Sequence, residues 1–500
     1  MKKMRKRLQI LRFSVTEHPN NAYRTIFAVC MMLLTMSISA KTLIAADKKI
    51  VVLSDPHVMA PELLVSKGDA WTNYLNGQRK MVDYSQALFD EMVAKIKDEI
   101  KPDLVLITGD LTKDGEQLSH KYVISKLDEL REGGIQTLVI PGNHDRGANA
   151  DAVLYDGANK SPVGVATDGW FATQYANYGY GSTSERESTS LTYACEPIEG
   201  LVVIGIDSGT GGALSSATLD WIVGKASAVQ ESGKRVIAMM HHPLIPHVTN
   251  AESLVPTYVV SNHDKIRKAL IGAGIKVIFT GHFHTSDIAK DFNDELTKEI
   301  YDVNTGSLIS YPCDYREVNV SGDLSELSLT TGHITSLQGD ETFTSEYAKT
   351  RLHDSVKKAV KEKITAKITA KFGAVIAASM ADNDIIEKMA NNVADAFIIH
   401  AEGNEADVDT EEIMSALSLA FTFMPETKAM CKSMLEDKAP YGEEGRENVT
   451  DDLSLTITFL LGDANGDGVV NVADIVEIIN KGDVDDDDIN AIIAIIMQSK

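Results

Sequence analysis

Short apolar runs alternate with amphipathic stretches along residues 47–337. Most of these runs are apolar at every position rather than at every second one, which is typical of strands covered on both faces. The predicted strands are residues 50–53, 104–107, 137–140, 201–206, 236–240 and 276–279. Segments between them, such as 85–100 and 119–133, have helical periodicity. The pattern therefore predicts a layered α/β domain over residues 47–337.

The polar segment 147–186 interrupts this pattern, and a segment of that length is typical of a lid or a mobile loop. Beyond residue 344 the apolar positions recur at helical spacing, for example from Val356 to Ile368. We therefore expect a small all-helical accessory domain at 344–460 that ends in a closing strand. Residues 461–500 form a last segment, rich in Asp, Asn and Gly.

The N-terminus has a basic segment followed by an apolar one that ends in small residues. This order is typical of a secretory signal peptide, which we assign to residues 1–46. An uncleaved membrane anchor is the alternative. The prediction is export to the periplasm or the extracellular space, with no stable membrane span after signal removal. Three cysteines then remain, Cys195, Cys313 and Cys431, and export would permit a Cys195–Cys313 disulfide.

The chain has a formal net charge of -24, from 72 acidic and 48 basic residues. Phosphate backbones are bound by clustered Lys and Arg, so this balance argues against duplex DNA or an anionic membrane surface as a partner. It favours solubility and the binding of cations instead.

Polar clusters directly follow five of the predicted strands, where open α/β sheets place their ligand sites. These clusters are Asp55-Pro-His57, Gly109-Asp110, Gly142-Asn-His-Asp145, His241-His-Pro243 and Gly281-His-Phe-His284. One such cluster alone is typical of a turn or a helix cap. Five together would bury several His and Asp side chains, which is costly without a metal. The mixture of carboxylate, imidazole and amide donors favours Mn²⁺, Fe or Zn²⁺ over Ca²⁺ or Mg²⁺.

The order and spelling of these motifs resemble the calcineurin-like metallophosphoesterase family, with D-x-H, GD, GNHD, HHP and GHxH all present between residues 48 and 337. The resemblance implies a four-layer α/β/β/α sandwich and a dinuclear metal site. The ligands it implies are Asp55, His57 and His284 for one metal, Asn143, His241 and His282 for the other, and Asp110 as the bridge. Two such cations can share a hydroxide and clamp phosphoryl oxygens for in-line displacement.

His144 is too close in sequence to Asn143 to be an expected second ligand, but its side chain can face the substrate. We assign to it transition-state stabilisation or protonation of the leaving alkoxide, with Asp145 fixing its tautomer. Further candidates for binding phosphate are Arg146, His242 and His247.

Lys113 argues against one subclass, because purple acid phosphatases place a Tyr ligand where Lys113 stands, three residues after the Gly-Asp aspartate. The remaining pattern most resembles cyclic-nucleotide and glycerophosphodiester phosphodiesterases. The resemblance implies a hydrolase acting on a phosphate-ester small molecule or an oligonucleotide-like substrate. One alternative is a phosphomonoesterase. Another is a non-catalytic assembly or binding protein whose metals only stabilise the fold and which acts through the C-terminal module formed by residues 461–500.

An acidic loop near the C-terminus has the spacing of an EF-hand calcium site, with Gly468 at its sixth position. The expected Ca²⁺ ligands are Asp463, Asn465, Asp467, Val469, Asn471 and Asp474. The loop resembles a dockerin repeat, which implies a cohesin-type protein partner. A second repeat, from Asp483, lacks the glycine and the last acidic ligand. A single Ca²⁺ site that stabilises the module is therefore the alternative.

Overall fold

A computed structural model describes most of the chain beyond residue 45. The described residues are 46–147, 151–249, 257–293, 298–403, 405, 408–425, 427–436, 451–459, 472 and 476. The expected signal peptide lies outside this set except for residue 46. Also outside it are the expected calcium ligands Asp463, Asn465, Asp467, Val469, Asn471 and Asp474.

The first of two large sheets has six strands in the order β18-β15-β14-β1-β3-β4. Their bounds are β1 (Lys48–Leu53), β3 (Leu104–Ile107), β4 (Gln136–Val139), β14 (Asp314–Val320), β15 (Glu326–His333) and β18 (Ser454–Thr458). β1, β3 and β4 are parallel, with Val52 opposite Leu106 and Leu106 opposite Leu138. The other strands pair antiparallel. The three strands predicted for this sheet are confirmed.

The second large sheet has seven strands in the order β12-β13-β11-β10-β9-β8-β7. Their bounds are β7 (Glu185–Arg186), β8 (Tyr193–Ile198), β9 (Leu201–Ile206), β10 (Arg235–Met240), β11 (Val277–Thr280), β12 (Asp287–Phe292) and β13 (Glu299–Asn304). β9, β10, β11 and β13 are parallel. The predicted strands β9, β10 and β11 are therefore central in the sheet and point the same way.

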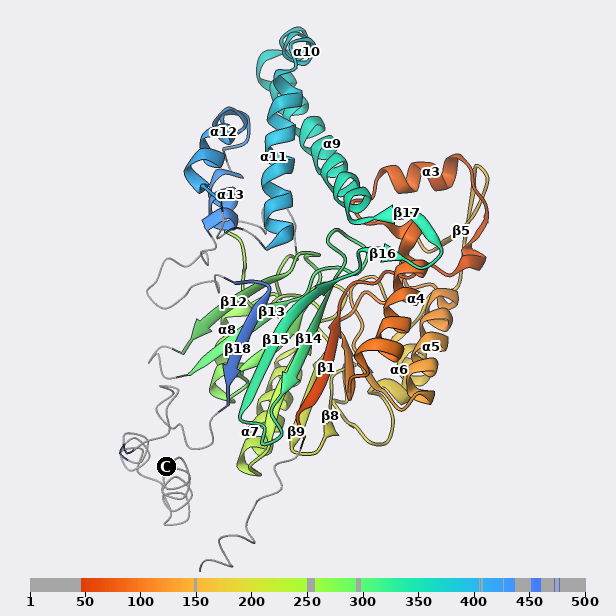
Figure 1. Ribbon diagram of the computed structural model, residues 1–500, viewed down its shortest axis with the longest axis vertical. Helices are drawn as coiled ribbons and strands as arrows, with labels where there is room; N and C mark the ends of the chain where they lie inside the picture. Colours follow the sequence, from red (N-terminus) through yellow and green to blue (C-terminus); the bar gives the residue numbers. More distant parts are fainter. Residues whose placement is uncertain are drawn as a thin grey trace, which may run out of the picture. The chain divides into compact units, whose positions relative to one another are not determined.

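Successive residues of the second sheet face two different hydrophobic clusters. Val203, Ile237 and Phe279 pack with apolar side chains of β1, β3 and β4. Their neighbours Ile204 and Ala238 pack with helices α7 and α8 instead. Apolar side chains of α4 and α5 pack with the strands of the first sheet, in the same cluster as Val203. The helices are α4 (Ser85–Lys95), α5 (Gln117–Glu132), α7 (Ser216–Glu231) and α8 (His263–Gly272). Burial on both faces explains why the strands are apolar at successive positions, and the fold is the predicted mixed α/β type (Figure 1).

The segment expected to be a lid or a mobile loop has secondary structure over residues 151–186. It contains β5 (Val153–Asp156), β6 (Asn159–Pro162) and α6 (Asp168–Gln174). Its aromatic side chains are buried in the main hydrophobic cluster, where Phe171 and Tyr175 stack with ring centroids 4.3 Å apart. Residues 151–186 therefore have regular elements that pack on the core, while a role as a lid stays a prediction.

The chain beyond residue 344 forms helices and then returns to the first sheet. The helices are α9 (Ser345–Phe372), α10 (Ala374–Asp382), α11 (Ile385–Glu402), α12 (Thr410–Phe423) and α13 (Thr427–Glu436). The expected closing strand, β18, pairs with β15, so that Ile457 lies opposite Leu327 (Figure 1). The strand thus extends the α/β sheet, and the helices are an insertion between strands of that sheet.

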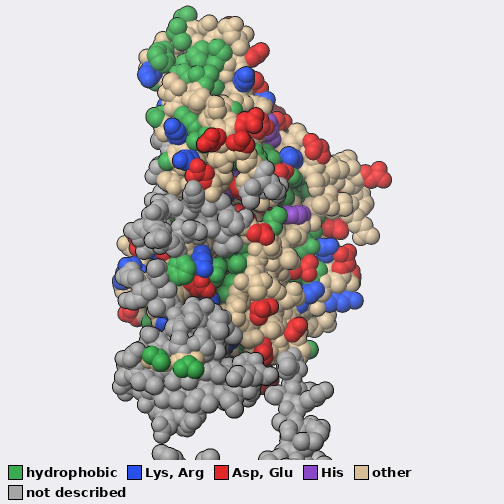
Figure 2. All heavy atoms as spheres, turned by 60° about the vertical axis from the view of Figure 1, so that its left-hand side comes forward, with side chains coloured by type: hydrophobic (Ala, Val, Ile, Leu, Met, Phe, Trp, Pro, Cys, Tyr) green, Lys and Arg blue, Asp and Glu red, His purple; other side chains and the backbone are tan. Residues whose placement is uncertain are grey.

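The outer end of the helical region carries an apolar patch. Figure 2 shows hydrophobic side chains gathered there, and the exposed ones are Phe372, Val375 and Ile376. Across the described residues, no helix is long and apolar enough to cross a membrane.

The three cysteines beyond the expected signal peptide are free thiols. Cys313 and Cys431 are buried and Cys195 is half-buried. The expected Cys195–Cys313 disulfide is therefore wrong.

Candidate metal centre

Three strands of the first sheet and two of the second lead into the predicted site residues. β1 leads into Asp55 and His57, β3 into Asp110, β4 into Asn143 and His144, β10 into His241, and β11 into His282 and His284. Within each sheet the carboxyl ends of parallel strands lie at the same edge, and side chains from these edges of the two sheets meet, as His57 and His284 do.

The backbone at this edge is held in an uncommon conformation. Five of the eleven non-glycine residues with positive φ in the described chain are predicted metal ligands. They are Asp55 (φ 50°), His57 (39°), Asp110 (49°), His282 (73°) and His284 (67°). Each such residue costs about 1–3 kcal/mol, and such conformations cluster at functional sites. The concentration of this strain at one edge supports a functional role for the edge.

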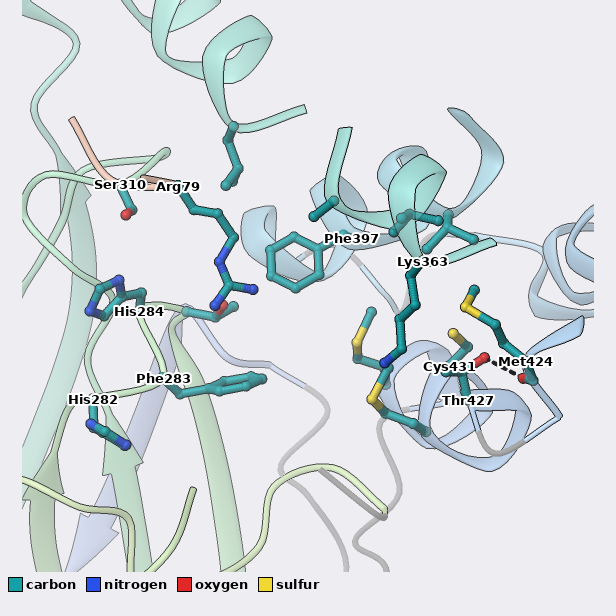
Figure 3. A pocket seen from close by; sticks show the side chains of 17 residues that line it. Arg79, His282, Phe283, His284, Ser310, Lys363, Phe397, Met424, Thr427 and Cys431 are labelled. Carbon is teal, nitrogen blue, oxygen red and sulfur yellow. Dashed lines mark hydrogen bonds between the residues drawn. The ribbon is translucent and has the colours of Figure 1, made fainter. Parts of the chain in front are cut away.

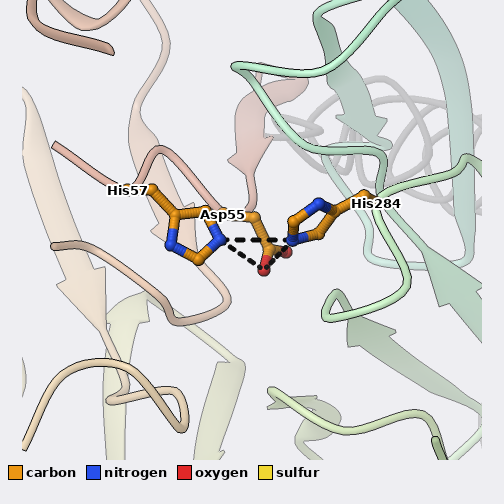
Figure 4. A group of neighbouring side chains, drawn as sticks. All are labelled: Asp55, His57 and His284. Atoms are coloured by element: carbon orange, nitrogen blue, oxygen red, sulfur yellow. Dashed lines mark hydrogen bonds and ion pairs between the residues drawn. The ribbon is translucent and has the colours of Figure 1, made fainter. Parts of the chain in front are cut away.

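Asp55, His57 and His284 form the first group of candidate ligands. One donor atom from each lies within 4.8 Å of the others. His284 Nε2 is 3.2 Å from His57 Nε2 and 3.3 Å from Asp55 Oδ1. Figure 4 shows the three side chains pointing toward one another, as a shared cation would require.

Asp110, His241 and His282 form a second group within the same distance limit. His241 Nε2 is 3.2 Å from His282 Nδ1 and 2.9 Å from Asn143 Oδ1. The Nδ1 atom of His241 donates to the carbonyl of Thr108 at 2.9 Å, so its Nε2 faces the group.

Asp110 lies between the two groups. Its Oδ2 atom is 3.5 Å from His57 Nε2 and 3.5 Å from His241 Nε2. Gly142 permits the close packing here, because a Cβ atom at this position would lie 2.2 Å from Asp110 Oδ1. One carboxylate is thus shared by two donor groups, which is the position that the resemblance assigns to a bridging ligand.

Two of the candidate donor atoms have no hydrogen bond within the described part of the protein, as expected for atoms that bind a metal ion. Asp55 Oδ1 and His282 Nε2 are buried, and neither has a hydrogen-bond partner among the described residues. Buried polar atoms are normally paired, so these two are open positions for a cation. Burial holds the pKa of His57 well below its usual range and lowers that of His282 to about 3, so both rings are neutral and can donate lone pairs.

The carboxylates and histidines of the site shift one another's pKa values. Burial alone would raise the pKa of Asp110, but the nearby rings of His241, His144 and His57 hold it well below the usual value. Burial alone would lower the pKa of His241, but the Asp110 carboxylate raises it to about 9. A cation bound beside Asp110 would displace that proton, because His241 can bind a metal only as the neutral imidazole.

His144 is held at this edge by two aspartates. Its backbone N–H donates to Asp110 Oδ1 at 2.7 Å, and its Nδ1 atom lies 2.9 Å from Asp114 Oδ1. Its side chain is 30% exposed. His57, Asp110 and His144 form a third group, in which one donor atom from each residue lies within 4.8 Å of the others. This geometry would also allow His144 to act as a metal ligand.

Asp114, rather than Asp145, contacts the His144 ring. The Asp145 carboxylate instead accepts hydrogen bonds from the backbone N–H groups of Leu111, Thr112 and Gly142 at 2.8–3.0 Å. Its role is to tie the β3 and β4 loops together. The expected Asp145–His144 contact is therefore wrong, because the loop geometry directs Asp145 to the backbone.

Lys113 points away from the candidate metal ligands. It is fully buried, pairs with Asp114, and lies 3.1 Å from Glu116 Oε1. The residue that replaces the Tyr of purple acid phosphatases thus stabilises the aspartate behind His144.

The three predicted phosphate-binding residues have different surroundings. Arg146 pairs with Asp207 and Asp168, and His247 lies between Asp287 (2.9 Å) and Asp302 (3.4 Å). These ion pairs engage both side chains away from the two ligand groups. His242 donates to or accepts from Ser208 at 2.8 Å and its ring centroid is 4.5 Å from that of His282. Only His242 of the three borders the metal ligands.

Two basic residues at the site were not predicted. Lys80 is buried, with Nζ 3.0 Å from His57 Nδ1, and Arg79 lines a cavity together with His282 and His284. The only signal in the sequence is a basic pair shortly after Asn76-Gly77, in a chain with a large acidic excess.

This cavity, of about 340 Å³, adjoins the metal ligands. Figure 3 shows the Arg79 guanidinium between His284 and Phe397, with the ring of Phe283 nearby. The far side of the cavity is formed by residues of α9, α11 and α13 and by Met424, which directly follows α12. The helical region therefore forms one wall of the space next to the candidate metal centre.

Residues 48–286 match the sequence profile of the family described as calcineurin-like phosphoesterase. A probable cyclic nucleotide phosphodiesterase from Rhodococcus erythropolis is 24% identical over 243 residues, which cover 47% of this chain and 65% of that protein. A cAMP/cGMP dual specificity phosphodiesterase from Mycobacterium tuberculosis is 22% identical over 223 residues, or 43% of this chain and 60% of that protein. The chain thus spans less than two thirds of the length of these relatives.

A solved structure of a dimetal phosphatase from Danio rerio aligns with 57% of this chain and 96% of its own chain. Its sequence identity is 12% and its TM-score 0.41.

Proposed function

Residues 48–286 form a calcineurin-like phosphoesterase domain, and from this premise we propose that the protein is a metal-dependent hydrolase of phosphate esters that prefers diesters to monoesters. The observation that carries the proposal is the position of Asp110 Oδ2, 3.5 Å from one histidine of each ligand group. That shared carboxylate is what a dinuclear site needs, and a single structural metal does not need it.

The residues that would hold the two cations are those implied by the resemblance. They are Asp55, His57, His284, Asn143, His241, His282 and the bridging Asp110. Bound there, the cations would act as Lewis acids that lower the pKa of water and neutralise charge on the phosphoryl oxygens. Mn²⁺, Fe or Zn²⁺ suits these mixed nitrogen and oxygen donors.

His144 is the proposed acid for the leaving oxygen. Asp114 accepts from Nδ1 and so orients the ring with Nε2 toward the substrate. Lys113 in turn pairs with Asp114 and keeps it ionised. The His144 side chain lies beside the two ligand groups, so proton transfer would occur next to the phosphoryl group.

The preference for diesters has two supports. The relatives from R. erythropolis and M. tuberculosis are both named phosphodiesterases. A diester also carries a second ester group that needs space beside the phosphorus, and the cavity bordered by His282 and His284 offers such space. A phosphomonoesterase would not need this second compartment.

We also propose the four-layer α/β/β/α arrangement for the domain. Its support is the alternation of β9, β10 and β11 side chains between one cluster shared with the first sheet and another shared with α7 and α8.

The proposals of export, of a Ca²⁺ loop at 463–474 and of a cohesin-type partner rest on the sequence alone. Mass spectrometry of the exported protein should find a new N-terminus between residues 40 and 47. An unprocessed N-terminus would contradict the signal peptide.

Turnover of two model esters tests the main proposal. The purified protein, loaded with Mn²⁺, should hydrolyse bis-p-nitrophenyl phosphate with a higher kcat/KM than p-nitrophenyl phosphate. No turnover of either ester, with two bound metals measured, would reject the enzyme and favour the non-catalytic alternative. Faster turnover of the monoester would overturn the diester preference.

A further inference from the structure

We propose that the cavity between the His282–His284 segment and the helical region binds the apolar part of the substrate, so that the natural substrate is an amphiphilic phosphodiester bearing an alkyl or acyl chain. The inference rests on the proposed phosphodiester hydrolysis and adds to it the class of the esterified group.

The lining of the cavity has an unusual composition for this protein. The chain has 72 acidic residues, yet none of the 17 residues that line the cavity is acidic. Most of the lining is apolar, including Phe283, Leu352, Val360, Phe397, Met430 and Met434. A volume of about 340 Å³ is at the lower end of the range for small-molecule sites, and it is large enough for a medium-length alkyl chain.

The cavity is continuous with the candidate metal centre. His282 and His284 belong to both, and Arg79 lies beside His284 at the same end (Figure 3). Arg79 is exposed, and among the described residues no carboxylate forms an ion pair with its guanidinium, which can therefore pair with a ligand anion. A phosphodiester seated at the metals would thus have its anionic group at this end and its ester group directed among Phe283 and Phe397.

The walls of the cavity are fixed by contacts between the helical region and the α/β domain. Tyr311 Oη donates to Glu402 Oε1 at 2.6 Å, and the Thr249 N–H donates to Ser433 Oγ at 2.8 Å. Arg351 pairs with Asp83 at 2.7 Å. An apolar cavity with such supported walls does not collapse, and it gains free energy when an apolar group replaces weakly held water.

The polar side chains on the helical side of the cavity are Lys363, which is exposed, and Thr427, whose hydroxyl is engaged. The Thr427 hydroxyl donates to the carbonyl of Met424 at 2.7 Å. Three lining methionines, Met424, Met430 and Met434, offer flexible apolar surface that adapts to chains of different shape. A nucleobase would bring several polar edge atoms into this lining, and unpaired polar atoms are costly to bury. The lining therefore favours a hydrocarbon chain over a nucleoside.

A series of alkyl p-nitrophenyl phosphates tests the inference on the Mn²⁺-loaded protein. We expect kcat/KM to rise from the methyl through the butyl to the octyl ester, with the octyl ester preferred over the methyl ester by at least about 30-fold, because each buried methylene contributes up to about fourfold. All esters are used below the concentration at which they form micelles. Equal kcat/KM values for methyl and octyl esters, or faster hydrolysis of 3′,5′-cyclic AMP than of the octyl ester, would overturn the inference.

Two tryptophan substitutions on α9 test whether the preference for a long alkyl chain arises in this cavity. Ala359 lines the cavity, and Ala359→Trp should reduce the octyl-to-methyl ratio by at least about fivefold by filling it. Ala366 is exposed, two turns further along α9, and does not line the cavity. Ala366→Trp should keep the wild-type ratio. A general loss of folded protein lowers both rates equally and leaves the ratio unchanged, so an unchanged ratio in Ala359→Trp contradicts the assigned site.

Calorimetry gives a readout that does not depend on turnover. Monomethyl octylphosphonate should bind the Mn²⁺-loaded protein at least about tenfold more tightly than monomethyl methylphosphonate, with a more negative heat-capacity change. Absence of turnover with every ester would reject the proposed function, whereas turnover and binding without chain-length dependence would reject only the amphiphilic substrate.

Discussion

The two sides of the cavity are held in different ways. On the sheet side, hydrogen bonds fix the positions of polar atoms. On the helical side, apolar side chains are held by packing against their neighbours. His241 is fully buried and its ring is fixed by the hydrogen bond to Thr108. Across the cavity, Met430 and Phe397 pack against Val248, Tyr258 and their neighbours by apolar contact. Polar networks depend on each atom, while hydrophobic packing tolerates exchanges that conserve volume.

This difference assigns a separate role to each side of the site. The sheet side determines which bond can be broken, because the candidate metal ligands and His144 lie there. The helical side determines which ester fits, because its residues meet the substrate away from the phosphorus. We therefore expect changes on the sheet side to affect all esters alike, and changes on the helical side to affect esters according to their size.

Loss of Asp110 should have the largest effect. Asp110→Ala removes the carboxylate shared by the two ligand groups, and kcat/KM for every ester should fall by a factor on the order of 10³ or more. Metal content, measured by inductively coupled plasma mass spectrometry, should fall below two ions per chain. Asp98→Ala, at an exposed position on the segment after α4, is the matched control and should behave as wild type. Two tightly bound metals in Asp110→Ala would contradict the bridging role.

Substitution of His144 should have a smaller effect that spares the metals. His144→Ala should lower kcat/KM for all esters by about 10²-fold, because general acid catalysis contributes on that order. Both metals should remain, since the two ligand groups are complete without His144. Loss of a metal ion in this variant would instead assign His144 to the ligands.

Substitutions of Asp114 and Asp145 test which aspartate orients His144. The structure shows the contact with Asp114, whereas the sequence predicted one with Asp145. Asp114→Asn should lower kcat/KM by about tenfold with little change in Tm, because Lys113 keeps its pairing with Glu116. Asp145→Asn should lower Tm, because one amide oxygen cannot replace a carboxylate that accepts three backbone N–H groups. The opposite pattern would restore Asp145 as the partner of His144.

The sequence alone predicted those strands whose own residues show a clear hydrophobic pattern. β3 and β9 were predicted over 104–107 and 201–206 because a fully buried strand is apolar at every position. β12, which reads Asp-Ile-Ala-Lys-Asp-Phe, was missed because its order comes from pairing with β13 rather than from its composition. The metal-ligand motifs were found because each follows a recognisable strand.

The remaining features of the site depend on contacts between distant segments. Asp114 contacts His144 only because the loops after β3 and β4 lie side by side, and no spacing in the sequence encodes that distance. The cavity combines Arg79 with residues of three helices that follow 270 or more positions later, so no single segment has a pattern that predicts it. Local motifs therefore predict the metal ligands of this protein, but not the cavity that we expect to select the ester.

A core substitution in the helical region should have the smallest effect on the chemistry. Ile364 is fully buried in a cluster with Met424, which lines the cavity, and Ile364→Ala should lower the free energy of unfolding by about 2–4 kcal/mol. Since Ile364 contacts neither ligand group, kcat/KM for methyl p-nitrophenyl phosphate should stay within about twofold of wild type. The octyl ester should lose more, because a loosened cluster holds Met424 less firmly. Ile376→Ala, at an exposed position on α10, is the control and should change neither stability nor selectivity. If Ile364→Ala lowered the rates of methyl and octyl esters equally, the helical wall would serve the catalytic step itself, and the division of roles between the two walls would fail.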